Sequence, residues 1–221
     1  NYAAHYGTIQ VPRDYADDRA GSLQLHFVRI PAQNPSGKTP IFYLTGGPGL
    51  SNLTFQPFPA LLEQRDFVMV GYRGIDDNAP LMCLSVQEAM SGKKDALGAE
   101  TRAALAEAFS ACANELAGRG VDLGNYTIRE VIADIEAVRR ALGYDKINLL
   151  SESYGTRIAY FYALHHPEVT TRSVMLGANP PGRFIFEKAK IQQQLEYYAE
   201  LWAQAEDNPE REVDLLASMQ Q

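Results

Sequence analysis

The sequence predicts an α/β fold, with a mostly parallel sheet flanked by helices. Short apolar runs bounded by Gly and Pro are typical of strands that are covered on both faces of a parallel sheet. Such runs lie at 41–44, 67–70, 147–150 and 174–176. A strongly periodic helix lies between the second and third runs. Strands that alternate with helices imply right-handed crossovers, which place the strands parallel to one another.

The remaining elements follow from local patterns. Residues 21–31 alternate apolar and polar side chains, which is the period of a half-buried strand. The periodic helix begins at Thr127, where Thr127-Ile128-Arg129-Glu130 has the pattern of a capping box, and it ends at Gly143. A further helix is expected over 157–166. The apolar residues of the periodic helix recur at helical spacing: Val131, Ile132, Ile135, Val138, Ala141 and Leu142.

Two stretches interrupt this alternation. Residues 76–126 contain an Ala-rich segment near 100–117 that predicts a helix, followed by a Gly-rich loop. Residues 180–221 continue as helix-like sequence rich in Glu and Gln, with no further strand signal. We therefore expect residues 1–179 to be the N-terminal half of the sheet domain, with 76–126 as an insertion, and 180–221 to begin a helical cap.

Composition excludes several classes of protein. The chain has 221 residues and a net charge of −7, which argues against binding to nucleic acid, where a basic patch is expected. No apolar run is long enough to span a membrane. The first residues, Asn1–His5, do not have the pattern of a signal peptide. No CxxC or Cys/His cluster is present, and we expect neither a metal site nor a cofactor.

The turn Ser151-Glu152-Ser153-Tyr154-Gly155 is the main functional signal. It lies between an apolar strand and a helix, which is the context of the nucleophile elbow in α/β-hydrolases. The tight turn requires small residues two before and two after the nucleophile; Gly155 satisfies this, and Ser151 replaces the usual glycine. The helix also directs its N-terminal amides toward developing negative charge. We predict that Ser153 is the nucleophile.

A glycine-rich loop, Thr45-Gly46-Gly47-Pro48-Gly49, directly follows the strand at 41–44. Such a sequence also occurs in ordinary turns. In an α/β-hydrolase, however, the loop after the third strand supplies a backbone amide of the oxyanion hole, and the absence of a Cβ allows close approach to a substrate oxygen. The coincidence of this loop with the elbow about 100 residues later favours the functional interpretation.

The chain resembles the proline iminopeptidase and tripeptidyl aminopeptidase group of α/β-hydrolases, serine peptidases of the S33 type. The resemblance implies Ser153 as nucleophile, the amides of Gly47 and Tyr154 as the oxyanion hole, and Gly46 next to the substrate. This chain departs from the family at two positions. It has Thr45 where the family usually has His or Asn, and Gly71 where the family usually has Asp. Both departures affect the substrate assignment more than the assignment of the fold. The segments that carry the resemblance are 46–49, 72–74 and 152–156, together with 7–15 and 134–139.

The chain has only two cysteines, Cys83 and Cys112. From composition alone they could be two buried apolar side chains or a disulfide. Tripeptidyl-type sequences place a pair at similar positions, so the resemblance implies a bridge. A bridge would in turn indicate a periplasmic or secreted protein.

A serine hydrolase also needs a histidine base and a carboxylate, which follow the nucleophile in this fold. His165 and His166 are on the helix that begins at the nucleophile, about 18 Å along its axis. His5 and His26 precede the nucleophile strand. We therefore expect the catalytic Asp and His to come from a C-terminal companion chain or segment.

Three functions remain open at this point. The leading hypothesis is an aminopeptidase that releases N-terminal residues or short peptides through an acyl-enzyme on Ser153. A carboxylesterase acting on small esters would use the same serine, since fold and elbow do not determine the substrate. A non-catalytic binding protein with a hydrolase fold is the third possibility, because no catalytic histidine is evident.

Overall fold

The computed structural model describes residues 2–78, 80–91, 95, 98–182, 187–205, 214, 215 and 217. The chain divides into two compact units, Asn1–Pro180 and Pro181–Gln221. The second unit contains helix α6 (Lys188–Gln204), none of whose described residues is buried. The assignment of this unit to a helical cap stays a prediction. None of the helices in the described part of the chain is long and apolar enough to cross a membrane.

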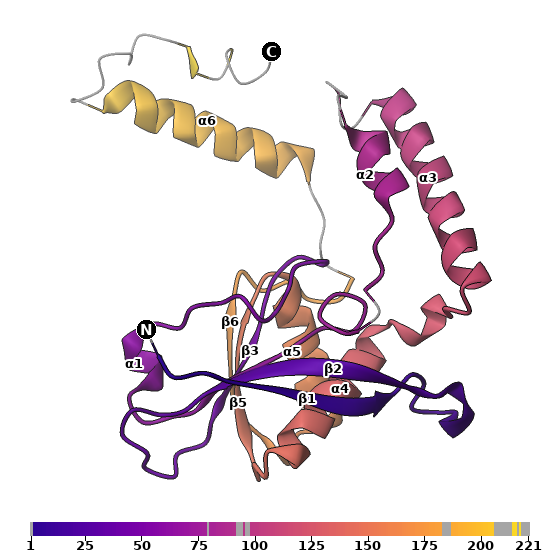
Figure 1. Ribbon diagram of the computed structural model, residues 1–221. Coiled ribbons are helices and arrows are strands. Elements are labelled where there is room, and N and C mark those ends of the chain that lie inside the picture. The colour runs from indigo at the N-terminus through magenta and orange to yellow at the C-terminus, as the bar shows by residue number, and fades with distance from the viewer. Residues whose placement is uncertain are drawn as a thin grey trace. The chain divides into compact units, whose positions relative to one another are not determined.

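The first unit is built on a mixed sheet with the strand order β1-β2-β4-β3-β5-β6 (Figure 1). Strands β4, β3, β5 and β6 are parallel, whereas β1 and β2 form an antiparallel hairpin that joins β4. The strand bounds are β1 His5–Pro12, β2 Ser22–Ile30, β3 Ile41–Leu44, β4 Phe67–Val70, β5 Ile147–Glu152 and β6 Thr170–Leu176. The predicted parallel arrangement is confirmed for the central strands.

Both faces of the sheet are covered at β3 and β4. On one face, α4 (Ile128–Ala141) and α5 (Tyr154–His165) pack through Ile135, Val138 and Ile158 onto strand residues such as Phe42. On the other face, α1 (Pro59–Leu62) and the preceding loop cover a second cluster that contains Tyr43 and Phe67. Every residue of β3 and β4 is buried, which explains why these strands read as unbroken apolar runs. The last strand, β6, is different: Val174, Met175 and Leu176 are exposed, so the prediction that the run at 174–176 is covered on both faces is wrong.

Several boundaries differ from the sequence prediction. Strand β1 was not anticipated, although its residues pair along their whole length with β2. Helix α5 begins at Tyr154 rather than at 157, and β6 begins at Thr170 rather than at 174. The helix start at Thr127 and the stop at Gly143 (φ 72°) are confirmed. The capping box is not: the Thr127 hydroxyl contacts the Glu130 carboxylate instead of a backbone amide.

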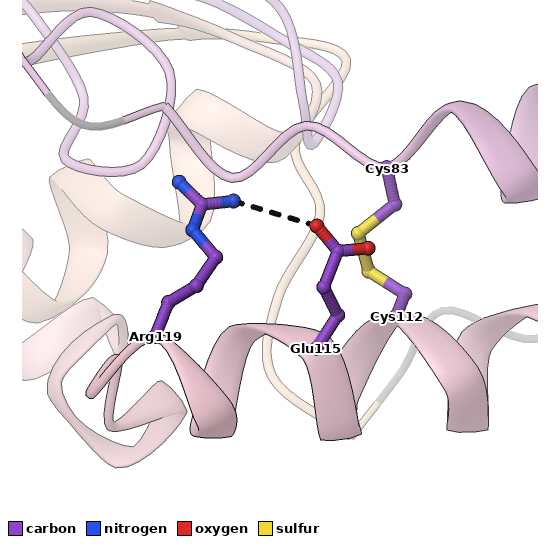
Figure 2. The surroundings of a disulfide bond; sticks show 4 residues. All are labelled: Cys83, Cys112, Glu115 and Arg119. Carbon is purple, nitrogen blue, oxygen red and sulfur yellow. Dashed lines mark ion pairs between the residues drawn. A yellow bond between two sulfur atoms is a disulfide. The ribbon is translucent and has the colours of Figure 1, made fainter.

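The insertion at 76–126 contains the expected Ala-rich helix, α3 (Ala99–Gly118), and a second helix, α2 (Leu84–Met90). The two helices run side by side. A disulfide joins Cys83, at the start of α2, to Cys112 on α3 (Figure 2). The predicted bridge is therefore present. Nearby, Glu115 of α3 forms an exposed ion pair at 3.7 Å with Arg119, the residue that follows the helix.

Candidate active site

The functional motifs meet at the carboxyl-terminal end of the parallel strands, because the strands that lead into them are neighbours in the sheet. Leu44 at the end of β3 pairs with Ser151 near the end of β5. The glycine loop that begins at Thr45 and the turn at Ser153 therefore leave the sheet side by side. Strand β4, the other neighbour of β3, ends at Val70 on the same edge. The carboxyl ends of parallel strands are the usual place of sites in open α/β sheets.

Ser153 occupies a strained backbone conformation at this edge. Its φ is 46°, and within the described residues it is the single non-glycine residue with a positive φ. Residues in such sparsely populated regions persist only when their surroundings hold them, and they cluster at active sites. Here the Ser153 amide donates to the Leu176 carbonyl at 2.9 Å, and the Ser153 carbonyl accepts from the Thr156 hydroxyl at 2.6 Å. The side chain itself is exposed.

The small residues around the turn are required by close packing. A Cβ on Gly155 would lie 2.2 Å from the Leu44 carbonyl oxygen and 2.6 Å from that of Thr45, so helix α5 approaches the end of β3 only with glycine there. Ser151 is fully buried, and its hydroxyl donates to the Val174 carbonyl at 3.2 Å. Serine therefore fits the position at which the family usually has glycine.

The glycine loop lies against the nucleophile. Gly46 is buried, and a Cβ at this position would be 3.2 Å from the Cβ of Ser153. Gly47 is exposed with φ of 120°, a conformation that favours glycine. Tyr154 is the first residue of α5, so its amide has no partner within the helix. The roles of Gly46, Gly47 and Tyr154 toward a substrate stay predictions.

The sequence did not reveal a buried polar cluster beneath this loop. Asn52 is fully buried, and its side chain bonds to the backbones of both β3 and β4. Its own amide donates to the carboxylate of Asp76 at 2.9 Å. A Cβ on Gly71 would meet the Asp76 Cβ at 2.5 Å, so Gly71, one of the departures from the family, leaves room for this carboxylate. A lone polar residue in a loop gives no sequence signal of such a role.

Glu152, the last residue of β5, forms a second polar link, to β3 and to the glycine loop. Its carboxylate accepts from the Tyr43 hydroxyl at 2.8 Å and from the Thr45 hydroxyl at 3.4 Å. Burial raises the pKa of Tyr43 to about 12, with the Glu152 carboxylate adding to the rise and the Thr45 hydrogen bond opposing it. Tyr43 therefore remains a donor at neutral pH. Thr45, the other departure from the family, takes part in this link.

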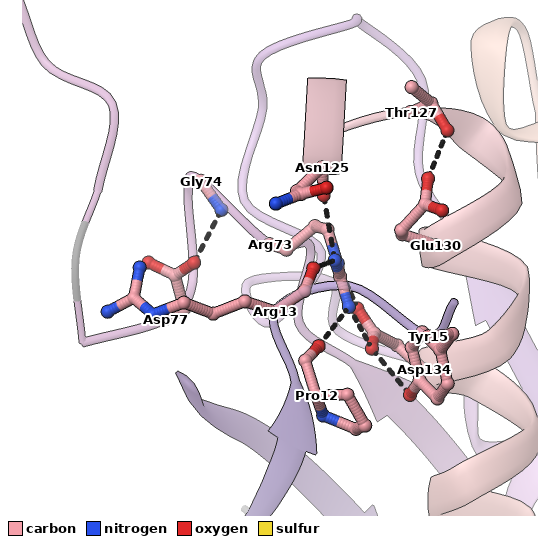
Figure 3. Close-up of polar contacts among 10 residues, drawn as sticks. All are labelled: Pro12, Arg13, Tyr15, Arg73, Gly74, Asp77, Asn125, Thr127, Glu130 and Asp134. Carbon is pink, nitrogen blue, oxygen red and sulfur yellow. Dashed lines mark hydrogen bonds and ion pairs between the residues drawn. The ribbon is translucent and has the colours of Figure 1, made fainter. Parts of the chain in front are cut away.

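The segments that carry the resemblance outside the site form one buried ion-pair network (Figure 3). The Arg73 guanidinium donates to Asp134 of α4 and to the backbone carbonyls of Pro12 and Arg13. Tyr15 also donates to Asp134, at 2.9 Å. The network joins the N-terminal segment, the loop after β4 and α4, so its role is to support the edge that bears the site.

The four histidines, all within the described residues, lie away from Ser153. His26 of β2 is separated from β5 by β4 and β3, a distance of about 14 Å at ordinary strand spacing. His5 of β1 is one strand farther. The ring of His165 contacts the Phe161 carbonyl, and that of His166 lies against Tyr162, both near the far end of α5. None of them can serve as the base for Ser153 in this arrangement.

A metal site is also missing from the part of the chain that the structure describes. No group of at least three His, Cys, Asp or Glu side chains there is arranged to hold an ion. The groups available for chemistry at the site are the exposed Ser153, the amides at the N-terminus of α5 and in the glycine loop, and the neighbouring Glu152 carboxylate.

Comparisons with known proteins agree with the fold. A family model described as alpha/beta hydrolase fold matches residues 39–218. The tripeptidyl aminopeptidase of Streptomyces lividans is 28% identical over 211 residues, which cover 86% of this chain and 38% of that protein. Serine protease Hip1 of Mycobacterium tuberculosis H37Rv is 31% identical over 79% of this chain and 36% of its own length. A proline iminopeptidase of Xylella fastidiosa is 41% identical over 64 residues, 28% of this chain and 20% of that protein. The chain thus spans little more than a third of the length of its longer relatives.

Proposed function

Since this chain belongs to the alpha/beta hydrolase fold family, we propose that it is a serine hydrolase in which Ser153 forms an acyl-enzyme. The observation that carries the proposal is the backbone of Ser153. Its φ of 46°, at a strand-to-helix turn with an exposed side chain, is the conformation that presents a nucleophile above the edge of a sheet.

The oxyanion hole is proposed to consist of the amides of Gly47 and Tyr154. When the Ser153 Oγ attacks a carbonyl carbon, the negative charge develops on the carbonyl oxygen. Donors that are already oriented toward that position stabilise the transition state more than the substrate. The contact of Gly46 with Ser153 supports this role, because it brings the amide of the next residue close to the nucleophile.

The proposed substrate is a peptide with a free N-terminus. Relatives named tripeptidyl aminopeptidase and serine protease support a peptidase. The alignment with the tripeptidyl aminopeptidase covers 86% of this chain. Attack by Ser153 would transfer the N-terminal portion of the peptide to its Oγ, release the remaining peptide as an amine, and water would then hydrolyse the ester.

The base and the acid are proposed to come from a C-terminal segment. A serine hydroxyl at neutral pH is a weak nucleophile without a histidine within about 3 Å. The positions of His5, His26, His165 and His166 support a base from outside these 221 residues. The comparisons give no support for a separate companion chain, since the relatives extend well beyond the matched part.

The compartment is proposed to be the periplasm or the cell exterior. Disulfides persist in oxidising environments and are rare in the cytosol. The bond between Cys83 and Cys112 supports this location.

Matched chromogenic substrates test the proposed function. The full-length protein should hydrolyse tripeptide p-nitroanilides with a free amine and lose that activity when the amine is acetylated. Ser153→Ala should abolish turnover, whereas Ser110→Ala, an exposed serine on α3, should not change it. Hydrolysis of p-nitrophenyl acetate alone would make the protein a carboxylesterase. Absence of any turnover, with no reaction toward a fluorophosphonate, would make it a binding protein.

A further inference from the structure

We infer that Asn52 is a positioning residue for the oxyanion hole, held in place by Asp76. The inference rests on the proposed function, because it assigns a task to the glycine loop next to Ser153. Asn52 does not touch the reacting atoms. It acts through the backbone of Thr45, the residue that leads from β3 into the loop.

The side chain of Asn52 is fully buried and makes three hydrogen bonds, two as donor and one as acceptor. Its Oδ1 accepts from the Thr45 amide at 2.7 Å. Its Nδ2 donates to the carbonyls of Tyr43 at 2.9 Å and Val70 at 2.7 Å. The Asn52 side chain thus bonds to Thr45 at the start of the loop that contains Gly46–Gly49. It also connects this loop to both β3 and β4. Leaving any of these buried backbone groups unpaired would carry a desolvation cost.

Asp76 fixes the backbone of Asn52. One of its carboxylate oxygens accepts from the Asn52 amide at 2.9 Å and from the Tyr72 amide at 3.0 Å. Hydrogen bonds to an ionised carboxylate are stronger than neutral ones. The end of the glycine loop is therefore anchored to the loop that follows β4.

The Thr45 peptide connects this anchor to the nucleophile. Its carbonyl lies against Gly155 of the elbow, where a Cβ would come within 2.6 Å, and it accepts a long hydrogen bond of 3.4 Å from the Tyr72 hydroxyl. The next residue, Gly46, packs on Ser153. A displacement of Thr45 would consequently move the Gly47 amide relative to Ser153. Displacements of about 1 Å in such constellations can lower rates by about 100-fold.

The chemistry of the position requires an amide. Only a group that donates twice and accepts once at the same place satisfies Tyr43, Val70 and Thr45 together. The variant Asn52→Asp has nearly the same shape but places a carboxylate oxygen against two carbonyl oxygens. Asn148 offers a matched control: its Nδ2 donates to the carbonyls of Thr39 at 3.0 Å and Pro40 at 3.3 Å, at the opposite end of the sheet.

Steady-state kinetics of Asn52→Asp, Asp76→Asn and Asn148→Asp in the full-length protein test the inference. We expect kcat to fall about 100-fold in Asn52→Asp and about 10-fold in Asp76→Asn, with KM changed less than about threefold, because oxyanion donors act mainly in the transition state. Inhibition by a peptide aldehyde, whose adduct carries an oxyanion, should weaken in parallel with kcat/KM. Asn148→Asp should lose stability but keep kcat.

The outcomes separate this inference from the proposed function. A wild-type protein whose Ser153 does not react with a fluorophosphonate would overturn the proposed function itself. If Ser153 reacts normally, wild-type kcat in folded Asn52→Asp would overturn the inference alone. Should Asn52→Asp fail to fold, Asp76→Asn decides: unchanged kcat, or a loss equal to that of Asn148→Asp, would overturn the positioning role.

Discussion

Arg73 and Asp134 form a two-point ion pair in the interior of the first unit. The Arg73 Nε lies 2.8 Å from Oδ2, and the Nη2 lies 2.7 Å from Oδ1, although the residues are 61 positions apart. The side chains are 0% and 1% exposed. Each residue belongs to a segment that carries the family resemblance. In these two segments the resembling residues therefore support the structure and take no part in the chemistry at Ser153.

Removing one partner of this pair should strongly destabilise the protein. Asp134→Ala leaves a buried guanidinium without its counter-charge, which costs about 3–5 kcal/mol in free energy of unfolding. Glu115→Ala removes the exposed pair with Arg119 and should change stability by less than about 1 kcal/mol. Urea denaturation of both variants measures the difference. Equal, small effects would show that the Arg73–Asp134 network does not support the fold.

Gly155 should not tolerate a side chain. In Gly155→Ala the Cβ would overlap the backbone carbonyl of Leu44 at 2.2 Å, and this backbone is part of a buried strand. We expect a loss of at least about 3 kcal/mol in unfolding free energy together with loss of activity. Gly118→Ala is the control, since nothing lies within 4 Å of its added Cβ; alanine there should be neutral or stabilising. A fully stable Gly155→Ala would contradict the close approach of α5 to β3.

Glu136 should contribute to the pH dependence of stability. Burial opposes its charge, but hydrogen bonds from Arg139, Arg140 and Tyr162 outweigh burial and lower its pKa to about 2. Because this folded-state pKa lies below the usual value of 4.5, the stabilisation is complete above pH 4.5 and is lost as the pH falls toward 2. The stability difference between wild type and Glu136→Gln should therefore shrink over that range. Glu168→Gln, an exposed control, should show no such trend in the same denaturation series.

The disulfide should stabilise the insertion. Cys83 and Cys112 close a loop with a sequence separation of 29, for which the chain-entropy model gives about 3–4 kcal/mol. Thiol titration in denaturant without reductant should find no free cysteine. The Cys83→Ser/Cys112→Ser double variant should show faster hydrogen exchange in α2 and α3 than in α4. Two free thiols in the mature protein would contradict the bridge and the proposed compartment.

The sequence predicted most elements whose pattern is dictated by burial. Strands β3 and β4 read as unbroken apolar runs because every residue in them is buried. Strand β1 escaped prediction because it is an edge strand with mostly exposed or half-buried residues, and its pairing with β2 is a long-range relationship. Helix α2 contains no buried residue, so it lacks the apolar stripe that identifies a helix.

The site was predictable only where its residues follow one another in the chain. Ser153 and Gly155 sit in one turn, and the constraint on each is local. The roles of Asn52 and Asp76 arise from contacts among segments that end β3, begin the next loop and follow β4. No spacing in the sequence specifies such contacts, because they depend on how strands are ordered in the sheet.

The site of covalent labelling tests directly whether Ser153 is the nucleophile. The full-length protein is incubated with a fluorophosphonate, digested, and the adduct is located by peptide mass spectrometry. We expect one adduct per chain, on Ser153, with labelling and hydrolysis lost together in Ser153→Ala. An active protein labelled at another residue, or one that retains hydrolysis as Ser153→Ala, would contradict the assignment of Ser153 as the nucleophile.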